Sequence, residues 1–388
     1  MPTSAAGVWP PGFLAMCGAF RHEFRRRGTG RFCSVVGRAS CRLPGRGLNL
    51  LLHILILALS FAIILAGSEL FTNGVEWAGQ HLAISEAAVG SLLAAVGTAL
   101  PETFIPAVAL MHRSASGTAH RAVGVGAIVG APMMLATLAL FVMGVAAIAF
   151  RKRRRQISLT VPPANVRRDL GFFLPVFLVL IALGFCHLGQ WIRWAAAIAL
   201  LVLYCAYSIT MLRLARADGI ELDRGLLAER IFRGDPLAPR ASVTLIQVVA
   251  GVVLILIGAN EFVARIVAFS HQANLNPGIL SLILSPLATE LPEKYNSVVW
   301  IRQGKDHLAM ANITGAMVFQ TCIPVAIGLA FSPWQLTHAE LLAGGIGLIS
   351  GTILFINVRD GELGTPTLMV GGVAYAIFLA GLALLGRF

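Results

Sequence analysis

Residues 97–102 read GTALPE and residues 288–293 read ATELPE, and each stretch lies inside a long run of apolar residues. In both stretches a proline directly precedes a glutamate, Glu102 in the first and Glu293 in the second. A proline inside a helix removes a backbone hydrogen bond, and a carboxylate is costly in hydrocarbon. A chain that accepts both costs together, twice, is expected to use these residues for function.

The chain has 388 residues, of which 57% are hydrophobic and only 12% are charged. Soluble domains carry about 25% charged residues. The apolar runs are continuous, which is typical of membrane-spanning helices and not of a β-barrel. The net charge of +12 also suits nucleic-acid binding, but the arginines fall in predicted loops, as in membrane proteins. We therefore expect an integral protein of a bacterial plasma membrane, whose partners are lipid and inorganic cations and not nucleic acid.

From Leu48 onward the sequence predicts an all-α membrane protein with ten transmembrane helices, arranged as two inverted five-helix repeats. The expected parts are a basic segment that is disordered or upstream of the true start (1–47), a first repeat (48–213), a cytoplasmic linker (214–241) and a second repeat (242–388). The predicted spans are 49–74, 87–111, 122–149, 170–187, 192–213, 242–270, 278–301, 308–331, 339–357 and 367–386.

The two halves echo each other at fixed spacing. Gly67 precedes its Leu-Pro-Glu stretch by the same number of residues as Gly258 precedes the second stretch, and Thr98 matches Thr289. Five spans per half make the second copy enter the membrane from the opposite side, which is an architecture of secondary transporters. With the linker inside, sixteen Lys and Arg residues fall on the inner side and four on the outer side. Eight arginines in 1–47 oppose this orientation, so that segment is left out of the fold prediction.

Each Leu-Pro-Glu turn gathers oxygen donors. The prolines free the carbonyl groups four residues earlier, a threonine hydroxyl follows, and a carboxylate ends the turn. Hard cations such as Ca²⁺ and Na⁺ prefer oxygen ligands. The predicted midplane site contains Gly97, Thr98 and Glu102 from the first copy and Ala288, Thr289 and Glu293 from the second, with Glu102 and Glu293 as the metal ligands.

Glu290 adds a third carboxylate, because it lies three residues before Glu293 on one helical face. Three like charges in a low dielectric do not all ionise, so at least one is expected to be protonated when no cation is bound, which favours proton coupling. Neutralisation of a carboxylate by Arg265 or Lys294 is the open alternative to a proton. Lys294 is about 100° round the helix from Glu293, so it is expected to point elsewhere unless it bends back. Arg265 is the expected partner of Glu261, four residues earlier. Glu69 and Glu261 are as consistent with interfacial water as with a site.

The paired motifs and the two halves resemble the cation/calcium antiporter superfamily, of which sodium/calcium exchangers are the best-known members. The resemblance implies ion binding by Thr98, Glu102, Thr289 and Glu293. It also shows departures, since Ala99 and Glu290 replace the family's serines. The Gly-Ser-Asn stretches of the family correspond to residues 130–132 and 315–317, and its Asn or Asp positions correspond to Leu135 and Gln320. Gln320 is therefore a further candidate ligand.

The expected function is secondary antiport of Ca²⁺ or a related cation against Na⁺ or H⁺, with alternating access to one site. The departures leave an alternative open, which is a proton-coupled carrier of another cation or a scaffold or sensor that does not exchange ions. An enzyme is not expected, because HExxH, GxSxG and P-loop motifs are absent. No cofactor is expected, and the transported ions are the ligands.

Overall fold

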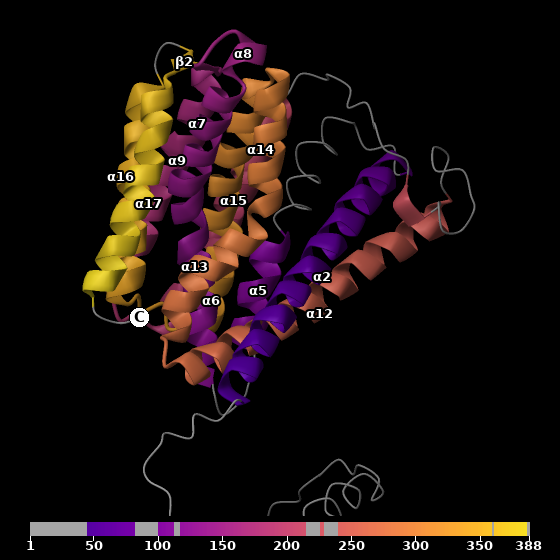
Figure 1. Cartoon of the computed structure of the whole chain (residues 1–388), viewed down its shortest axis with the longest axis vertical. Coiled ribbons are helices and arrows are strands. Elements are labelled where there is room, and N and C mark those ends of the chain that lie inside the picture. Colours follow the sequence, from indigo (N-terminus) through magenta and orange to yellow (C-terminus); the bar gives the residue numbers. More distant parts are fainter. Residues whose placement is uncertain are drawn as a thin grey trace, which may run out of the picture. The chain divides into compact units, whose positions relative to one another are not determined.

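The computed structural model describes residues 45–81, 100–111, 117–214, 226–228, 240–358 and 361–385 (Figure 1). The chain divides into Met1–Arg46 and Gly47–Phe388, and nearly all of the described residues belong to the second part. Gly97, Thr98, nearly all of the 1–47 segment and most of the linker lie outside the described residues, so the expectations for them stay predictions.

The described residues are mostly helical. Before the linker lie α2 (Gly45–His81), α5 (Leu100–Met111), α6 (Gly117–Met134), the π-helical turn η3 (Leu135–Ala139), α7 (Leu140–Ala149), α8 (Arg151–Arg154), α9 (Pro163–Leu183) and α10 (Gln190–Leu214). After it lie α12 (Ala241–Ala273), α13 (Pro277–Thr289), α14 (Leu291–Gln303), α15 (Asp306–Phe331), α16 (His338–Asn357) and α17 (Thr365–Leu384). Two short strands, β1 (Leu159–Thr160) and β2 (Glu362–Leu363), pair antiparallel.

Seven helical stretches in the described part of the chain are long and apolar enough to cross a membrane. They are α2, the continuous α6–η3–α7 stretch, α10, α12, α15, α16 and α17. The apolar helices α5 and α13 are shorter, and α9 carries Arg167, Arg168 and Asp169 near its start. The structure therefore supports an all-α membrane protein, and the count of ten spans stays a prediction.

The predicted span 278–301 is interrupted within the ATELPE stretch. Helix α13 ends at Thr289, and α14 begins at Leu291. Glu290, between them, has φ −89° and ψ 7°, a sparsely populated backbone conformation. Pro292 has no N–H to donate to the carbonyl of Ala288, which explains an interruption at this point of the span. The other prolines near the motif do not end a helix, because Pro132 lies within α6 and Pro286 within α13.

Helices α2 and α12 lie side by side and run antiparallel, with His81 of α2 beside Thr244 of α12 (Nε2–Oγ1, 3.2 Å; Figure 1). They touch through glycines. A Cβ on Gly67 would lie 2.9 Å from the carbonyl oxygen of Gly251, and a Cβ on Gly258 would lie 2.9 Å from that of Ser60. The sequence separation from Gly67 to Gly258 equals that from Ser60 to Gly251, so the contact is reciprocal. Small residues allow this close approach of two backbones.

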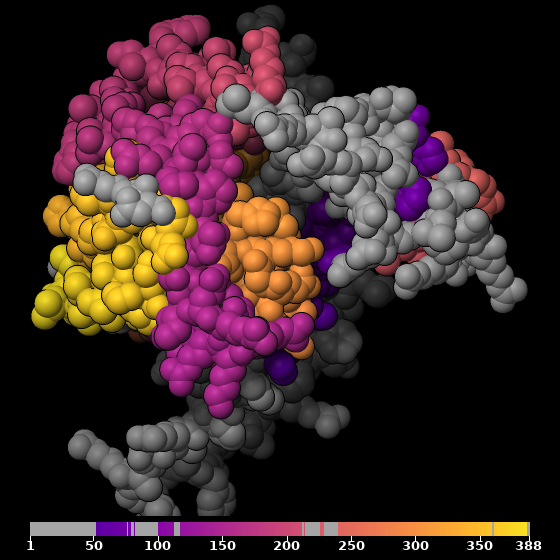
Figure 2. All heavy atoms as spheres, turned by 90° about the horizontal axis from the view of Figure 1, so that it is seen from above, coloured from indigo at the N-terminus to yellow at the C-terminus, as the bar shows by residue number. Residues whose placement is uncertain are grey.

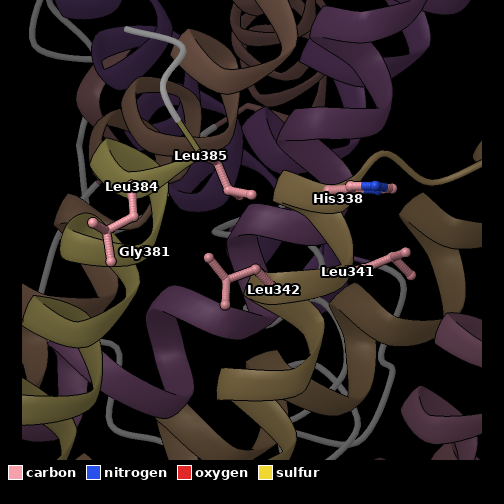
Figure 3. A pocket seen from close by; sticks show the side chains of 6 residues that line it. All are labelled: His338, Leu341, Leu342, Gly381, Leu384 and Leu385. Atoms are coloured by element: carbon pink, nitrogen blue, oxygen red, sulfur yellow. The ribbon is translucent and has the colours of Figure 1, made fainter.

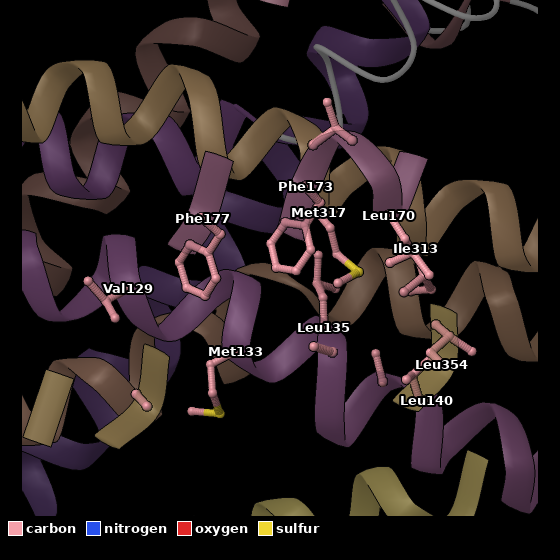
Figure 4. Close-up of a cluster of buried hydrophobic side chains, with 14 of the residues drawn as sticks. Val129, Met133, Leu135, Leu140, Leu170, Phe173, Phe177, Ile313, Met317 and Leu354 are labelled. Carbon is pink, nitrogen blue, oxygen red and sulfur yellow. The ribbon is translucent and has the colours of Figure 1, made fainter. Parts of the chain in front are cut away.

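The main apolar core lies between the α6–η3–α7 stretch, α9 and α15 (Figure 4). The Phe173 and Phe177 rings of α9 stack with centroids 5.1 Å apart, and Met317 of α15 is fully buried in the same cluster. Leu135, which the sequence comparison aligned with an Asn or Asp of the family, belongs to this apolar cluster. Its side chain packs and supplies no ligand atom.

The loops near residues 151–168, 302–305 and 358–364, which the sequence predicts on the inner side of the membrane, lie at the same end of the helices. Thr160 of β1 pairs with Glu362 of β2, and the side chain of Arg154 contacts Asp306 at the start of α15. Figure 2 shows this end, where magenta residues lie between the orange and yellow parts of the second half. At the other end, the backbone N–H of Leu336 donates to the carbonyl of Gly184 (3.3 Å).

Candidate functional site

Two glutamates occupy equal places in two helices. Glu102 of α5 and Glu293 of α14 each follow a Leu-Pro pair, so they occupy equal places in the two repeated motifs. Their side chains are buried, with 5% and 1% exposure. Within the described residues, neither carboxyl oxygen of Glu102 or of Glu293 has a hydrogen-bond partner. In the part of the chain that the structure describes, no hydrogen bond therefore offsets the cost of burying these two carboxyl groups.

The structure brings the predicted carboxylates together. Glu102, Glu290 and Glu293 interact electrostatically with one another, although they come from two helices distant in sequence. The amide of Gln320, on α15, lies beside the carboxyl groups of Glu102 and Glu290, outside hydrogen-bonding geometry. Gln320 is fully buried, and neither its Oε1 nor its Nε2 has a partner in the described part of the chain. This polar side chain therefore faces the carboxylates without being used elsewhere.

Of the two alternatives that the sequence left open for Lys294, the structure shows the one in which it neutralises a carboxylate, and the expectation that it points elsewhere is wrong. Its Nζ lies 2.6 Å from Oε2 of Glu290, and the two side chains have 6% and 0% exposure. Positions four apart in a helix share a face, and the chain keeps nearly helical spacing across the interruption at Glu290. Glu290 is thus a paired carboxylate, whereas Glu102 and Glu293 have no hydrogen-bond or ion-pair partner among the described residues.

Hydroxyl groups line the buried side of α13. The Thr289 hydroxyl donates to the carbonyl of Ser285 (3.1 Å), and the Ser281 and Ser285 hydroxyls lie 2.8 Å apart. Ser281 donates in turn to the carbonyl of Val123 on α6 (2.7 Å). Thr289 was predicted from the sequence, but the two serines were not. Their signal was the regular spacing of Ser281, Ser285 and Thr289, which are four residues apart and so share one helical face. Ala288, the residue with the freed carbonyl, is half-buried.

Asn312 of α15 is another residue that the sequence analysis missed. Its Nδ2 donates to the backbone carbonyl of Glu293 (3.1 Å) and lies 3.4 Å from the hydroxyl of Ser297. An amide side chain inside an apolar run was a usable signal, because such a group must find partners in hydrocarbon. Asn312 joins α15, which carries Gln320, to the first turn of α14.

The remaining acidic candidates, Glu69 and Glu261, are more exposed than the residues of this cluster. Glu261 pairs with Arg265 (Oε2–Nη2, 3.3 Å), as predicted, and both side chains are partly exposed. Glu69 is exposed. Gly130 contacts α13, where a Cβ would lie 2.9 Å from Cγ of Pro286, so this glycine permits a close helix crossing.

In the described residues, no three His, Cys, Asp or Glu side chains lie close enough to hold a metal ion by themselves. A cation at Glu102 and Glu293 would therefore need other oxygen donors as well. The Gln320 amide lies beside the carboxyl groups, and Thr289 and Ala288 directly precede Glu290 in sequence, which makes their hydroxyl and carbonyl oxygens the further candidates. An apolar pocket between α16 and α17 offers no alternative, because its lining of leucines, Gly381 and His338 has no carboxylate (Figure 3).

Solved structures share this fold. The crystal structure of the H⁺/Ca²⁺ exchanger CAX aligns with a TM-score of 0.68 at 15% identity, covering 88% of this chain and 89% of that chain. A structure of the sodium-calcium exchanger NCX_Mj, soaked with Na⁺ and Sr²⁺, aligns with a TM-score of 0.55 at 18% identity, covering 85% and 99%. The fold is therefore one that membrane cation exchangers adopt.

A family model described as "Sodium/calcium exchanger protein" matches residues 52–213 and 243–385. The chain belongs to this family of cation antiporters. It is 21% identical over 317 residues to CaxA of Alkalimonas amylolytica, a protein named as a candidate antiporter, over 81% of this chain and 92% of that protein. These similar proteins are named as transporters, in line with the expectation that the chain is not an enzyme.

Proposed function

We propose that this chain is a secondary active antiporter that exchanges Ca²⁺, or a related divalent cation, for Na⁺ or H⁺. The observation that carries the proposal is the pair of buried carboxylates, Glu102 and Glu293, at equal places in two Leu-Pro-Glu motifs and with no hydrogen-bond partner among the described residues. One divalent ion neutralises two carboxylates, and so do two monovalent ions or protons. The similarity to exchangers of both coupling types supports the same class of reaction.

Exchange follows from the cost of buried charge. When the site is empty and both carboxylates are ionised, two uncompensated charges stand in hydrocarbon, at a cost of several kcal/mol each. A loaded site carries no net charge and can change its access from one side of the membrane to the other. The empty site rarely changes its access from one side to the other. One ion therefore crosses the membrane only in exchange for another ion that crosses in the opposite direction.

The ten-helix inverted repeat belongs to this proposal. Its support is the reciprocal contacts of Gly67 with Gly251 and of Gly258 with Ser60, the meeting of the predicted inner loops at one end, and the match of one family model to two segments. In this arrangement α5 belongs to the first repeat and α13–α14 to the second, so the site lies where the repeats face each other. Location in a bacterial plasma membrane stays a prediction from the sequence.

The test is ion flux in proteoliposomes that contain the purified chain. We expect Ca²⁺ uptake when an outward gradient of Na⁺ or of H⁺ is imposed, and little uptake without a gradient. Liposomes without protein control for leak. If no gradient of either ion drives Ca²⁺ uptake, the proposal is wrong.

One observation favours a second candidate, a proton-coupled carrier of another cation. Glu290 and Lys294 form an ion pair at a position where the resembling family has a serine, so one hydroxyl ligand is absent. In the same liposomes, flux of Mn²⁺, Mg²⁺ or K⁺ driven by a proton gradient, without Ca²⁺ flux, would favour this candidate. Binding of Ca²⁺ without any flux would favour a sensor.

A further inference from the structure

The Glu290–Lys294 pair lies inside the candidate site. Glu290 fills the interruption between α13 and α14, and Lys294 lies one turn later in α14. Their 2.6 Å contact uses Oε2 of Glu290, whereas Oε1 has no partner in the described part of the chain. Both side chains are buried, so water does not screen the pair.

Lys294 is also the cation that the whole cluster shares. Among the described residues, it is the basic side chain that interacts electrostatically with Glu102, with Glu290 and with Glu293. Arg265, by contrast, pairs with Glu261 at a partly exposed position. Within the described part of the chain, the cluster therefore holds three carboxylates and one covalently attached cation.

The ammonium group of Lys294 carries the same charge as a bound monovalent cation. It neutralises one carboxylate in every state of the transporter, since it cannot leave. Two carboxylates then remain for mobile ions, and they are neutralised by one divalent cation or by two monovalent cations. Without Lys294, the carboxylate of Glu290 would also need a mobile ion. Three monovalent cations would then be required when the site crosses loaded with monovalent ions.

We propose that Lys294 is a tethered counter-ion that fixes the exchange at two monovalent charges for each divalent cation, so that transport moves no net charge. This inference rests on the proposed function and adds its stoichiometry. A purely structural role makes a different prediction. If the pair only stabilises the helix interruption, its removal changes stability and leaves the coupling ratio unchanged.

The experiment measures Ca²⁺ accumulation in proteoliposomes at fixed ion gradients, with and without a K⁺ diffusion potential set by valinomycin. For the wild type we expect the same accumulation at both potentials. For Lys294→Met we expect accumulation to change with potential, by about fifty-fold per 100 mV at equilibrium if one net charge moves in each cycle. Lys294→Arg keeps the charge and is expected to stay insensitive to the potential.

The double variant Glu290→Gln/Lys294→Met is the matched control. It removes one negative and one positive charge together, so we expect its accumulation to be insensitive to potential again. The double variant leaves no unpaired charge at Glu290. It can therefore be measured even if Lys294→Met alone does not fold, as judged by size-exclusion chromatography. A double variant that responds to potential would overturn the inference.

Two further outcomes would also overturn it. In one, the wild type already responds to potential as strongly as Lys294→Met does. In the other, Lys294→Met folds, exchanges Ca²⁺ and remains insensitive to potential. Either result leaves the proposed antiport standing, because exchange itself has been observed. If the wild type shows no exchange under any gradient, the proposed function fails, and the inference fails with it.

Discussion

Arg154 of α8 and Asp306 of α15 form an ion pair (Nη2–Oδ2, 2.5 Å) whose two side chains are each only 2% exposed. The same carboxylate accepts the backbone N–H of Thr160 (3.0 Å), so the start of α15 is fastened to the β1–β2 connection. Because α15 also carries Gln320 and Asn312, this pair holds one end of the helix that faces the candidate site.

Removing the acidic partner should therefore destabilise the protein strongly. Asp306→Asn leaves the buried guanidinium of Arg154 unpaired, and we expect the free energy of unfolding to fall by about 3–5 kcal/mol. The measurement is unfolding in detergent micelles titrated with SDS. The control is Glu261→Gln at the partly exposed Glu261–Arg265 pair, where about 1 kcal/mol or less should be lost. Equal losses in both variants would contradict the prediction.

Neutralising either unpaired carboxylate should stop exchange. Glu102→Gln and Glu293→Gln each keep the shape of the side chain and remove the charge that a divalent ion must neutralise. We expect the initial rate of Ca²⁺ uptake in proteoliposomes to fall at least about tenfold, which corresponds to about 1.4 kcal/mol of lost ion binding. Glu261→Gln, outside the cluster, should retain uptake. Wild-type rates in both site variants would show that the ligands are assigned incorrectly.

The glycine contact between α2 and α12 should not accept a methyl group. A Cβ on Gly258 would lie 2.7 Å from Cγ1 of Ile64 and 2.9 Å from the Ser60 carbonyl, so Gly258→Ala should cost about 1–3 kcal/mol of unfolding free energy. Gly345→Ala in α16 is the control, because nothing lies within 4 Å of its Cβ. That variant should gain about 0.5–1 kcal/mol from the better helix former. A neutral Gly258→Ala would show that the two helices separate easily.

A buried carboxylate outside the site gives a further prediction. Asp169 accepts the hydroxyl of Tyr207 on one oxygen (2.7 Å) and that of Thr314 on the other (2.6 Å). Tyr207→Phe leaves one oxygen without a donor, and we expect a loss of about 1–3 kcal/mol of unfolding free energy. Tyr295→Phe, at a residue that is 70% exposed, should change stability little. The same micelle titration distinguishes the two, and a silent Tyr207→Phe would show that water replaces the hydroxyl.

Much of the helical architecture could be predicted from the sequence, because continuous apolar runs specify membrane helices directly. The gathering of Glu102, Glu290 and Glu293 was also predictable, since equal motifs in two halves imply facing positions. The place of the helix interruption was not. A proline marks the neighbourhood of a break, but the packing of the surrounding helices decides which residue leaves the helical conformation, and in this chain it is Glu290.

Contacts between residues far apart in the sequence could not be predicted either. The Arg154–Asp306 pair joins residues 152 positions apart, and no local pattern relates them. Lys294 is a different case, because its partner Glu290 is only four residues away. The sequence prediction considered the position of Lys294 only relative to Glu293. The rule that residues four apart share a helical face would have predicted its pairing with Glu290.

The reciprocal contacts of Gly67 with Gly251 and of Gly258 with Ser60 have a consequence for the origin of the chain. Each of the two helices presents the same surface to the other, as two subunits do in an isologous dimer. An ancestor half as long could have made the same contact with a second copy of itself. Duplication and fusion of such an ancestor would leave the two copies free to diverge, with Glu290 and Lys294 in one half and Ala99 in the other.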